Sequence, residues 1–283
     1  MPRKDLFNKE YLDRLNESFD ERYLALDPLK YVRRFREKAD QEIIGLVAAA
    51  LSYGIVEQIF NSLDFVLQRV GETPARFVRQ FDPKKDPERF DGFVHRFNRG
   101  RDLACLFWWL RQIYDQYETL EDFFLVGYAK EDASVRPALT SFVDRMLTLD
   151  NAGLYGGKKL PNEARVRFFL PHPRRGGGCK RLNMFLRWMV RPNDGKDLGL
   201  WRSVSPSQLV IPLDTHIINT VKKLGLTRRK TTDWKMAEEI TDKLKRLDPD
   251  DPLKYDFALC RLGMMQHWPQ KRHAYLLEER AHV

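Results

Sequence analysis

Apolar residues recur at helical spacing along most of this 283-residue chain, and this periodicity limits the folds that it can adopt. Between residues 40 and 52, one helical face carries four large apolar residues: Ile43, Ile44, Val47 and Leu51. Small residues that permit close helix packing lie beside them: Gly45, Ala48 and Ala49. The same pattern predicts further helices near 57–70, 101–117, 135–148, 179–190, 214–224, 232–247 and 252–264. Because alternating strand patterns are scarce, the sequence predicts an all-α fold.

One long interruption, residues 150–178, contains six glycines and three prolines. Loops of this length without regular structure are usually functional or disordered. The C-terminal part alone has few helices to cover each other's apolar faces, so we expect a single all-α domain over 1–283. It divides into an N-terminal helical part (1–149), a basic Gly/Pro-rich loop (150–178) and a C-terminal part with the remaining helices (179–270).

The composition is that of a soluble globular protein, with 43% hydrophobic and 31% charged residues. The longest uncharged apolar run, 43–56, is too short to span a bilayer, and the first 30 residues lack the apolar core of a signal peptide. We therefore expect a cytoplasmic protein that has no membrane partner. Three cysteines exclude a four-cysteine zinc or iron–sulfur site, and the six histidines show no metal-ligand spacing. No metal and no cofactor is predicted.

Positive charge is concentrated in one stretch of the chain. Residues 152–191 hold ten Lys/Arg against the single acid Glu163, which accounts for the whole formal net charge of +9. Such a concentration around a glycine loop predicts a polyanionic partner, and a solvated basic loop is the alternative.

The loop ends in the sequence Arg-Arg-Gly-Gly-Gly-Cys-Lys-Arg, residues 174–181. Its glycines, Gly176, Gly177 and Gly178, allow backbone N–H groups to turn towards a phosphate, and its arginines, Arg174, Arg175 and Arg181, add positive charge. Lys180 falls in the first helical turn, where the helix dipole and the arginines disfavour an additional proton. That environment suits a nucleophilic amine. The alternative is an ordinary solvated lysine.

Asp214 precedes the predicted helix 214–224 and is an expected helix N-cap. Its carboxylate could also face a pocket that holds Lys180. The two interpretations are compatible, because an N-cap side chain lies at the end of its helix.

The order of these features resembles the active-site region of helix–hairpin–helix DNA glycosylases, the superfamily of endonuclease III and the 8-oxoguanine glycosylases. Its bifunctional members have a hairpin that ends in glycine and a catalytic lysine, followed by an aspartate, and Lys180 and Asp214 match these positions. Their separation of 34 residues is nearest to that in archaeal 8-oxoguanine DNA glycosylases. The resemblance covers mainly 170–265. The overall pattern is also similar to a widespread bacterial family of conserved hypothetical proteins.

Two further segments are similar to those archaeal enzymes. "ALSYG" at 50–54 makes Tyr53 a candidate to fill the space left by an extruded base, or else a core tyrosine. "DFALCRLG" at 256–263 makes Asp256 a candidate contact to the base, or else a helix residue paired with Lys254 or Arg261. Where the archaeal enzymes sandwich the base between aromatic side chains, this chain has Met184 and Cys260.

The resemblance implies a two-lobed helical fold with a helix–hairpin–helix-like element and a cleft between the lobes. It implies a bifunctional DNA glycosylase/AP lyase of base excision repair that removes a damaged, for example oxidised, base through a lysine Schiff base. The partner would be lesion-containing duplex DNA, bound by a monomer that is associated with the nucleoid. The alternatives are a non-catalytic nucleic-acid-binding protein, for DNA or RNA, an enzyme acting on a small phosphate compound, and a helical interaction scaffold that uses "FWW" at 107–109.

Overall fold

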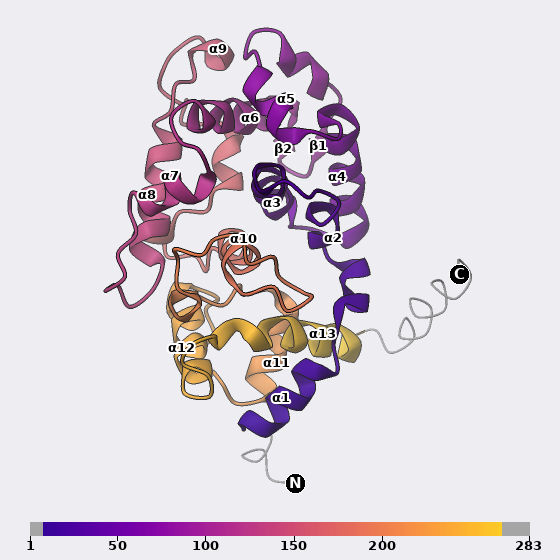
Figure 1. The fold of residues 1–283 in the computed structure, drawn as a ribbon, viewed down its shortest axis with the longest axis vertical. Helices are drawn as coiled ribbons and strands as arrows, with labels where there is room; N and C mark the ends of the chain where they lie inside the picture. The colour runs from indigo at the N-terminus through magenta and orange to yellow at the C-terminus, as the bar shows by residue number, and fades with distance from the viewer. Residues whose placement is uncertain (1–7, 268–283) are drawn as a thin grey trace, which may run out of the picture.

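The computed structural model describes residues 8–267, and their regular structure is almost entirely helical (Figure 1). The α-helices are Lys9–Glu17 (α1), Leu29–Val32 (α2), Lys38–Leu51 (α3), Val56–Val70 (α4), Pro74–Gln80 (α5), Gly100–Tyr114 (α6), Leu120–Leu125 (α7), Arg136–Leu147 (α8), Ala152–Tyr155 (α9), Lys180–Val190 (α10), Thr215–Lys223 (α11), Trp234–Lys245 (α12) and Asp256–His267 (α13). Short 3-10 helices span Glu21–Leu26 (η1), Asp86–Phe90 (η2), Arg165–Phe169 (η3), Pro173–Arg175 (η4), Pro206–Gln208 (η5) and Pro252–Tyr255 (η6). The all-α prediction is confirmed.

The strand content of the described residues is one antiparallel hairpin, Val94–His95 (β1) with Asn98–Arg99 (β2). Every predicted helical segment is present within a few residues of its expected bounds, with 252–264 starting as η6 and continuing as α13. The hairpin and the short helices α1, α5, α7 and α9 were not predicted. In this part of the chain no helix is both long enough and apolar enough to cross a membrane.

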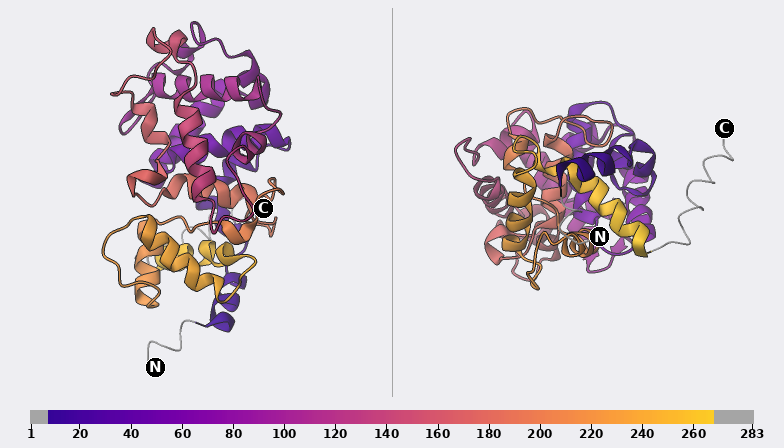
Figure 2. Two further views of the ribbon diagram at one scale, coloured as in Figure 1. Left: turned by 90° about the vertical axis from the view of Figure 1, so that its left-hand side faces the viewer. Right: turned by 90° about the horizontal axis from the view of Figure 1, so that it is seen from below.

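The helices form two groups, with α10 between them. Helices α3 to α9 occupy one end of the molecule, and α11, α12 and α13 occupy the other, where α1 joins them from the start of the described chain (Figures 1 and 2). Buried apolar side chains form one continuous cluster that includes residues of both groups. Helix α10 packs directly on α3 and, through Arg187, forms an ion pair with Asp256 of α13, so it contacts both groups.

Close packing at α10 depends on a glycine. A Cβ atom at Gly45 of α3 would lie 2.6 Å from Cε of Met189 and 3.3 Å from the ring of Phe185, both on α10. Glycine at this position therefore lets the two helices approach, as the small residues of α3 predicted. Gly263 of α13 does the same against α11, because a Cβ there would lie 2.5 Å from the His216 carbonyl oxygen.

Buried ion pairs fix the C-terminal end of α10. Arg187 Nε lies 3.1 Å from Oδ1 of the fully buried Asp197, and its Nη1 donates to Asp256 of α13. Arg191 also pairs with Asp197, and with Asp251 at 2.9 Å. Burial acts to lower the pKa of Arg187, but the two carboxylates outweigh it and raise that pKa above its ordinary value. The cluster joins α10 to α13, the two helices that carry most of the candidate site.

Candidate active site

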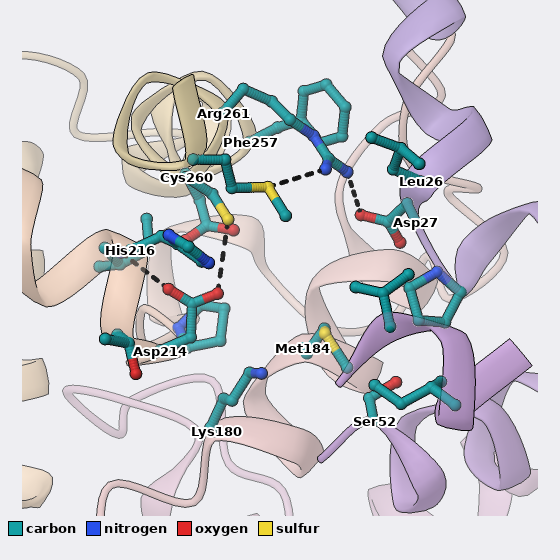
Figure 3. A pocket seen from close by; sticks show the side chains of 18 of the residues that line it. Leu26, Asp27, Ser52, Lys180, Met184, Asp214, His216, Phe257, Cys260 and Arg261 are labelled. Carbon is teal, nitrogen blue, oxygen red and sulfur yellow. Dashed lines mark hydrogen bonds and ion pairs between the residues drawn. The ribbon is translucent and has the colours of Figure 1, made fainter. Parts of the chain in front are cut away.

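A pocket of about 200 Å³ lies where α10, α11 and α13 meet the segments 26–28 and 52–59 (Figure 3). Five of the residues singled out in the sequence line it: Lys180, Met184, Asp214, Asp256 and Cys260. They come from three helices and span 80 positions of the chain, and the fold brings them to one cavity. Within residues 8–267, no group of three His, Cys, Asp or Glu side chains could hold a metal ion. His273 and His282 lie outside the described residues.

Lys180 is the first residue of α10. Cys179, the residue before it, has a left-handed backbone with φ 45°, and this turn directs the chain from the glycine loop into the helix. The Lys180 side chain is half-buried. Its amine points into the pocket, in the space between Met184 and Asp214 (Figure 3). Within the described chain the amine forms no hydrogen bond or ion pair. It is therefore available to a bound molecule.

Asp214 is the N-cap of α11, as predicted. Its Oδ1 accepts the backbone N–H of Ile217 at 2.7 Å, and its Oδ2 lies 3.4 Å from Sγ of Cys260. These two contacts hold the carboxylate at the pocket wall, and the N-terminal end of α11 stabilises its negative charge. Both interpretations of Asp214 hold for its position: it caps a helix and lines the pocket that contains Lys180.

Cys260 of α13 lies next to Asp214, on the side away from Lys180 (Figure 3). Burial raises the pKa of its thiol well above the usual range, the charge of Asp214 raises it further, and the charge of Lys180 acts in the opposite direction. Both charged groups are thus within electrostatic reach of the thiol. Cys260 remains protonated and serves as a weak hydrogen-bond donor to Asp214.

The residues that line the pocket include a buried donor and a buried acceptor without partners in the described chain. Asp256 is 2% exposed, and its Oδ2 accepts a hydrogen bond from Arg187. The other carboxylate oxygen, Oδ1, is buried and has no hydrogen bond. The same holds for Nη2 of Arg187. Burial raises the pKa of Asp256 to about 6, against the opposing effect of Arg187. Because unpaired buried polar atoms are costly, this pair is a natural contact for a polar ligand.

Sequence reasoning missed several lining residues. Arg187 is the partner of Asp256, in place of the expected Lys254 or Arg261; Arg261 instead pairs with Asp27, which also lines the pocket. The aromatic side chains of Phe257 and His216 line it as well (Figure 3). The spacing of seven between Lys180 and Arg187, which puts both on one helical face, was the available signal for Arg187.

The glycine loop before Lys180 is mainly exposed, with Arg174, Arg175, Gly176 and Gly177 at the surface and Gly178 half-buried. Gly176 has φ 81°, a backbone conformation that favours glycine. The loop is tied to α12, because the Trp234 amide donates to the Gly176 carbonyl at 3.0 Å. Arg174 lies 3.4 Å from Asp144. The 3-10 helix η3 precedes the loop, and η4 includes Arg174 and Arg175 at the start of the loop.

Arg181 was predicted to contact DNA, but the structure places it in the protein interior. It is 9% exposed, and its guanidinium donates to the backbone carbonyls of Ala50 and Phe168. The group also lies 4.8 Å from the ring centre of Tyr53 and 4.5 Å from that of Phe168. Because its donors serve the protein interior, Arg181 is a structural residue in this fold and not a surface contact for phosphates.

Tyr53 is also placed differently from the expected base-gap residue. It does not line the pocket, although its neighbours Ser52 and Gly54 do. Its hydroxyl lies 2.9 Å from the His95 carbonyl and 2.5 Å from Oδ1 of Asn98, a bifurcated bond to the β1–β2 hairpin. Burial raises the pKa of Tyr53 to about 12, so the hydroxyl stays a donor. The alternative of a core tyrosine describes it better.

Residues 27–265 match the family described as protein of unknown function (DUF2400). The chain belongs to this family. The expectation of an uncharacterised protein family is thereby confirmed, and the match includes every residue of the pocket except Leu26. No curated protein and no solved structure matches the chain.

Proposed function

We propose that this protein is a DNA glycosylase with AP lyase activity, in which Lys180 is the nucleophile and Asp214 its carboxylate partner. The observation that carries the proposal is the shared pocket, which holds an unpaired amine at the start of α10 and a fixed carboxylate at the start of α11. In this proposal the two groups of helices correspond to the lobes of a glycosylase-like fold, and the loop 174–179 corresponds to its hairpin.

In the first step, the target nucleotide leaves the base stack, at a cost of roughly a few kcal/mol that is smallest for damaged or mispaired bases. The Lys180 amine attacks C1′ of the deoxyribose, and the bond from C1′ to the base nitrogen breaks. The base departs with the bonding electrons and takes up a proton. The Asp214 carboxylate stabilises the positive charge that develops on the sugar and helps to remove the proton from the attacking amine.

In the second step, the C1′–nitrogen bond becomes a Schiff base as the sugar ring opens. Loss of a proton from C2′ then expels the 3′ phosphate, so the strand is cut on the 3′ side of the lesion. The amine between Met184 and Asp214 has no partner in the described chain that would compete with this attack.

The base itself would meet Asp256 and Arg187. The unpaired Oδ1 of Asp256 accepts an N–H of the base, and the unpaired Nη2 of Arg187 donates to an adjacent oxygen or nitrogen. Oxidised bases present such adjacent N–H and C=O groups. Phe257, Met184 and Cys260 supply the less polar contacts around the ring.

Borohydride trapping tests this function directly. Purified protein is mixed with end-labelled duplexes that carry 8-oxoguanine, an oxidised pyrimidine, uracil, an alkylated base or an abasic site. We expect a covalent adduct with at least one of them, absent from Lys180→Gln and retained by Lys222→Gln, a matched change at an exposed lysine of α11. Salt-sensitive DNA binding with no adduct on any duplex would instead favour the non-catalytic nucleic-acid-binding protein, to which the replacement of the aromatic sandwich by Met184 and Cys260 already points.

A further inference from the structure

A second cavity, of about 670 Å³, lies beside the glycine loop and contains none of the pocket residues discussed above. It is lined by the tip of the β1–β2 hairpin, by η3 and its flanks, and by part of 171–181. Six of its lining residues are arginines: Arg96, Arg99, Arg165, Arg167, Arg175 and Arg181. No Asp or Glu is among the described residues that line it. We call this cavity the arginine groove.

The hairpin is anchored so that its tip stays exposed. His95 and Asn98 face inward: the His95 ring bonds Ser62 Oγ at 2.7 Å and the Tyr53 carbonyl at 3.0 Å, and the Asn98 amide donates to the Arg165 carbonyl at 3.0 Å. Between them, the tip residues Arg96 and Phe97 are exposed, and Arg96 has a left-handed φ of 51°. A non-glycine residue in that conformation is strained, so the position is held by its surroundings.

Two phenylalanines on the groove are unusually exposed. Phe97 is 54% and Phe168 41% exposed, and their ring centres lie 5.4 Å apart in an edge-to-face arrangement. The ring centres of Tyr53 and Phe168 lie 4.9 Å apart in an edge-to-face contact. The buried Arg181 guanidinium packs over the Phe168 ring. These aromatic faces are thus rigidly placed at the surface, where a flat ligand would remove them from water.

The positive charge of the groove is exposed around these rings. Arg165 and Arg175 lie at the surface, and Arg165 Nη1 donates to the Phe97 carbonyl at 3.2 Å, which leaves its remaining donors open to solvent. Arg175 forms no ion pair within the part of the chain that the structure describes. Arginines beside aromatic faces, without acids, match a ligand that alternates phosphates with flat rings.

We propose that the arginine groove binds single-stranded nucleic acid, with unpaired bases stacked on the exposed faces of Phe97 and Phe168 and the phosphates on the exposed arginines. A flat apolar ring on a charged backbone satisfies both features of the groove at once, which an acidic peptide does not. The site requires no chemistry at Lys180, so it stands independently of the proposed glycosylase activity. A duplex would use it only where a nucleotide is unpaired.

The test combines binding with photocrosslinking on the full chain. An oligothymidylate of about 12 nucleotides with one central 5-iodouracil, and the same oligonucleotide in a fully paired duplex, are titrated by fluorescence anisotropy. We expect the single strand to bind more tightly than the duplex, and irradiation to link it to Phe97 or Phe168. Phe97→Leu, which keeps apolar bulk but removes the aromatic face, should weaken single-strand binding by roughly 5- to 150-fold. Phe97→Trp should keep it.

The control is Val126→Ala, which removes an equally exposed apolar side chain at the end of α7, outside the groove, and should leave binding unchanged. An oligouridylate arm separates the two sources of a single strand: tighter binding with the same crosslink supports the groove and assigns it to RNA. Unchanged affinity in Phe97→Leu, crosslinks only outside the groove, or stronger competition by polyglutamate than by oligothymidylate would overturn the proposal.

Discussion

The active-site pocket and the arginine groove use arginine in opposite ways. At the pocket, Arg187 is buried and paired with two carboxylates, so its charge organises the protein and leaves one unpaired donor for a ligand. In the groove, Arg165 and Arg175 are exposed with no acid among the lining residues, so their charge faces outward. A cluster of basic residues in a sequence therefore does not translate directly into a binding surface, because burial decides what each charge contacts.

The largest effect is expected from breaking the buried charge cluster. Arg187→Ala leaves Asp256 buried without its ion-pair partner and leaves Asp197 with Arg191 alone, which should lower the free energy of unfolding by about 3–5 kcal/mol. Urea denaturation measures this. Arg174→Ala, which removes an exposed ion pair with Asp144, should change the stability by no more than about 0.5 kcal/mol. Equal effects of the two variants would remove the distinction between buried and exposed arginines.

The next effect separates two roles of Asp214. Asparagine is as good an N-cap as aspartate, so Asp214→Asn should keep the stability of α11 while it removes the negative charge facing the sugar. We expect trapping on an abasic duplex to slow by about 10²-fold or more. Asp214→Ala should show the same loss of rate and a further loss of about 1 kcal/mol in stability. A fully active Asp214→Asn would show that the carboxylate only caps its helix.

A pH effect is expected at Asp256. Its pKa of about 6 in the folded protein exceeds the ordinary value of 3.8, so the folded state holds this proton more tightly than the unfolded chain. Protonation of Asp256 thus adds stability below about pH 6, and the gain is lost as the pH rises through 6. Relative to Asp256→Asn, which cannot titrate, the wild type should gain at most about 3 kcal/mol between pH 7 and 4. A constant difference between the two denaturation profiles would contradict the raised pKa.

The smallest effect concerns the exposed loop. Arg175→Ala should reduce the slope of log K against log salt for DNA binding by about 0.9, if this residue neutralises one phosphate. Arg174→Ala should reduce it less, because Arg174 already lies beside Asp144. Anisotropy titrations at several salt concentrations give both slopes. An unchanged slope for Arg175→Ala would remove the loop from the phosphate contacts.

Sequence periodicity predicted the helices well because each depends on local spacing. Helix α10, for example, buries Leu182, Phe185, Leu186 and Met189, the apolar stripe that its spacing indicates. The β1–β2 hairpin left no such signal, since strands of two residues are too short to alternate. Its position depends on hydrogen bonds of His95 and Asn98 with Tyr53 and Ser62, which are distant from the hairpin in the sequence.

The sequence named five residues of the candidate site, but it misplaced Tyr53 and missed Arg187 together with the ion pairs that Arg187 forms. Lys180 and Asp214 line one pocket, but the partner of Asp256 is Arg187, 69 residues earlier in the chain. The basic stretch 152–191 also includes Arg187 and Arg191, whose charges are neutralised in part by two acids just beyond it. These acids, Asp194 and Asp197, were not included when the charge of the stretch was counted. Such pairings form only when the helices pack, and a count along the chain cannot reveal them.

The most direct test of the central claim is the identity of the residue that forms the covalent adduct. The wild-type protein is incubated with an abasic-site duplex and borohydride, the linked species is digested, and the modified peptide is sequenced by mass spectrometry. We expect the sugar remnant on Lys180. An adduct on another lysine or on an N-terminal amine, or no adduct under conditions where the duplex is bound, would contradict Lys180 as the nucleophile of this pocket.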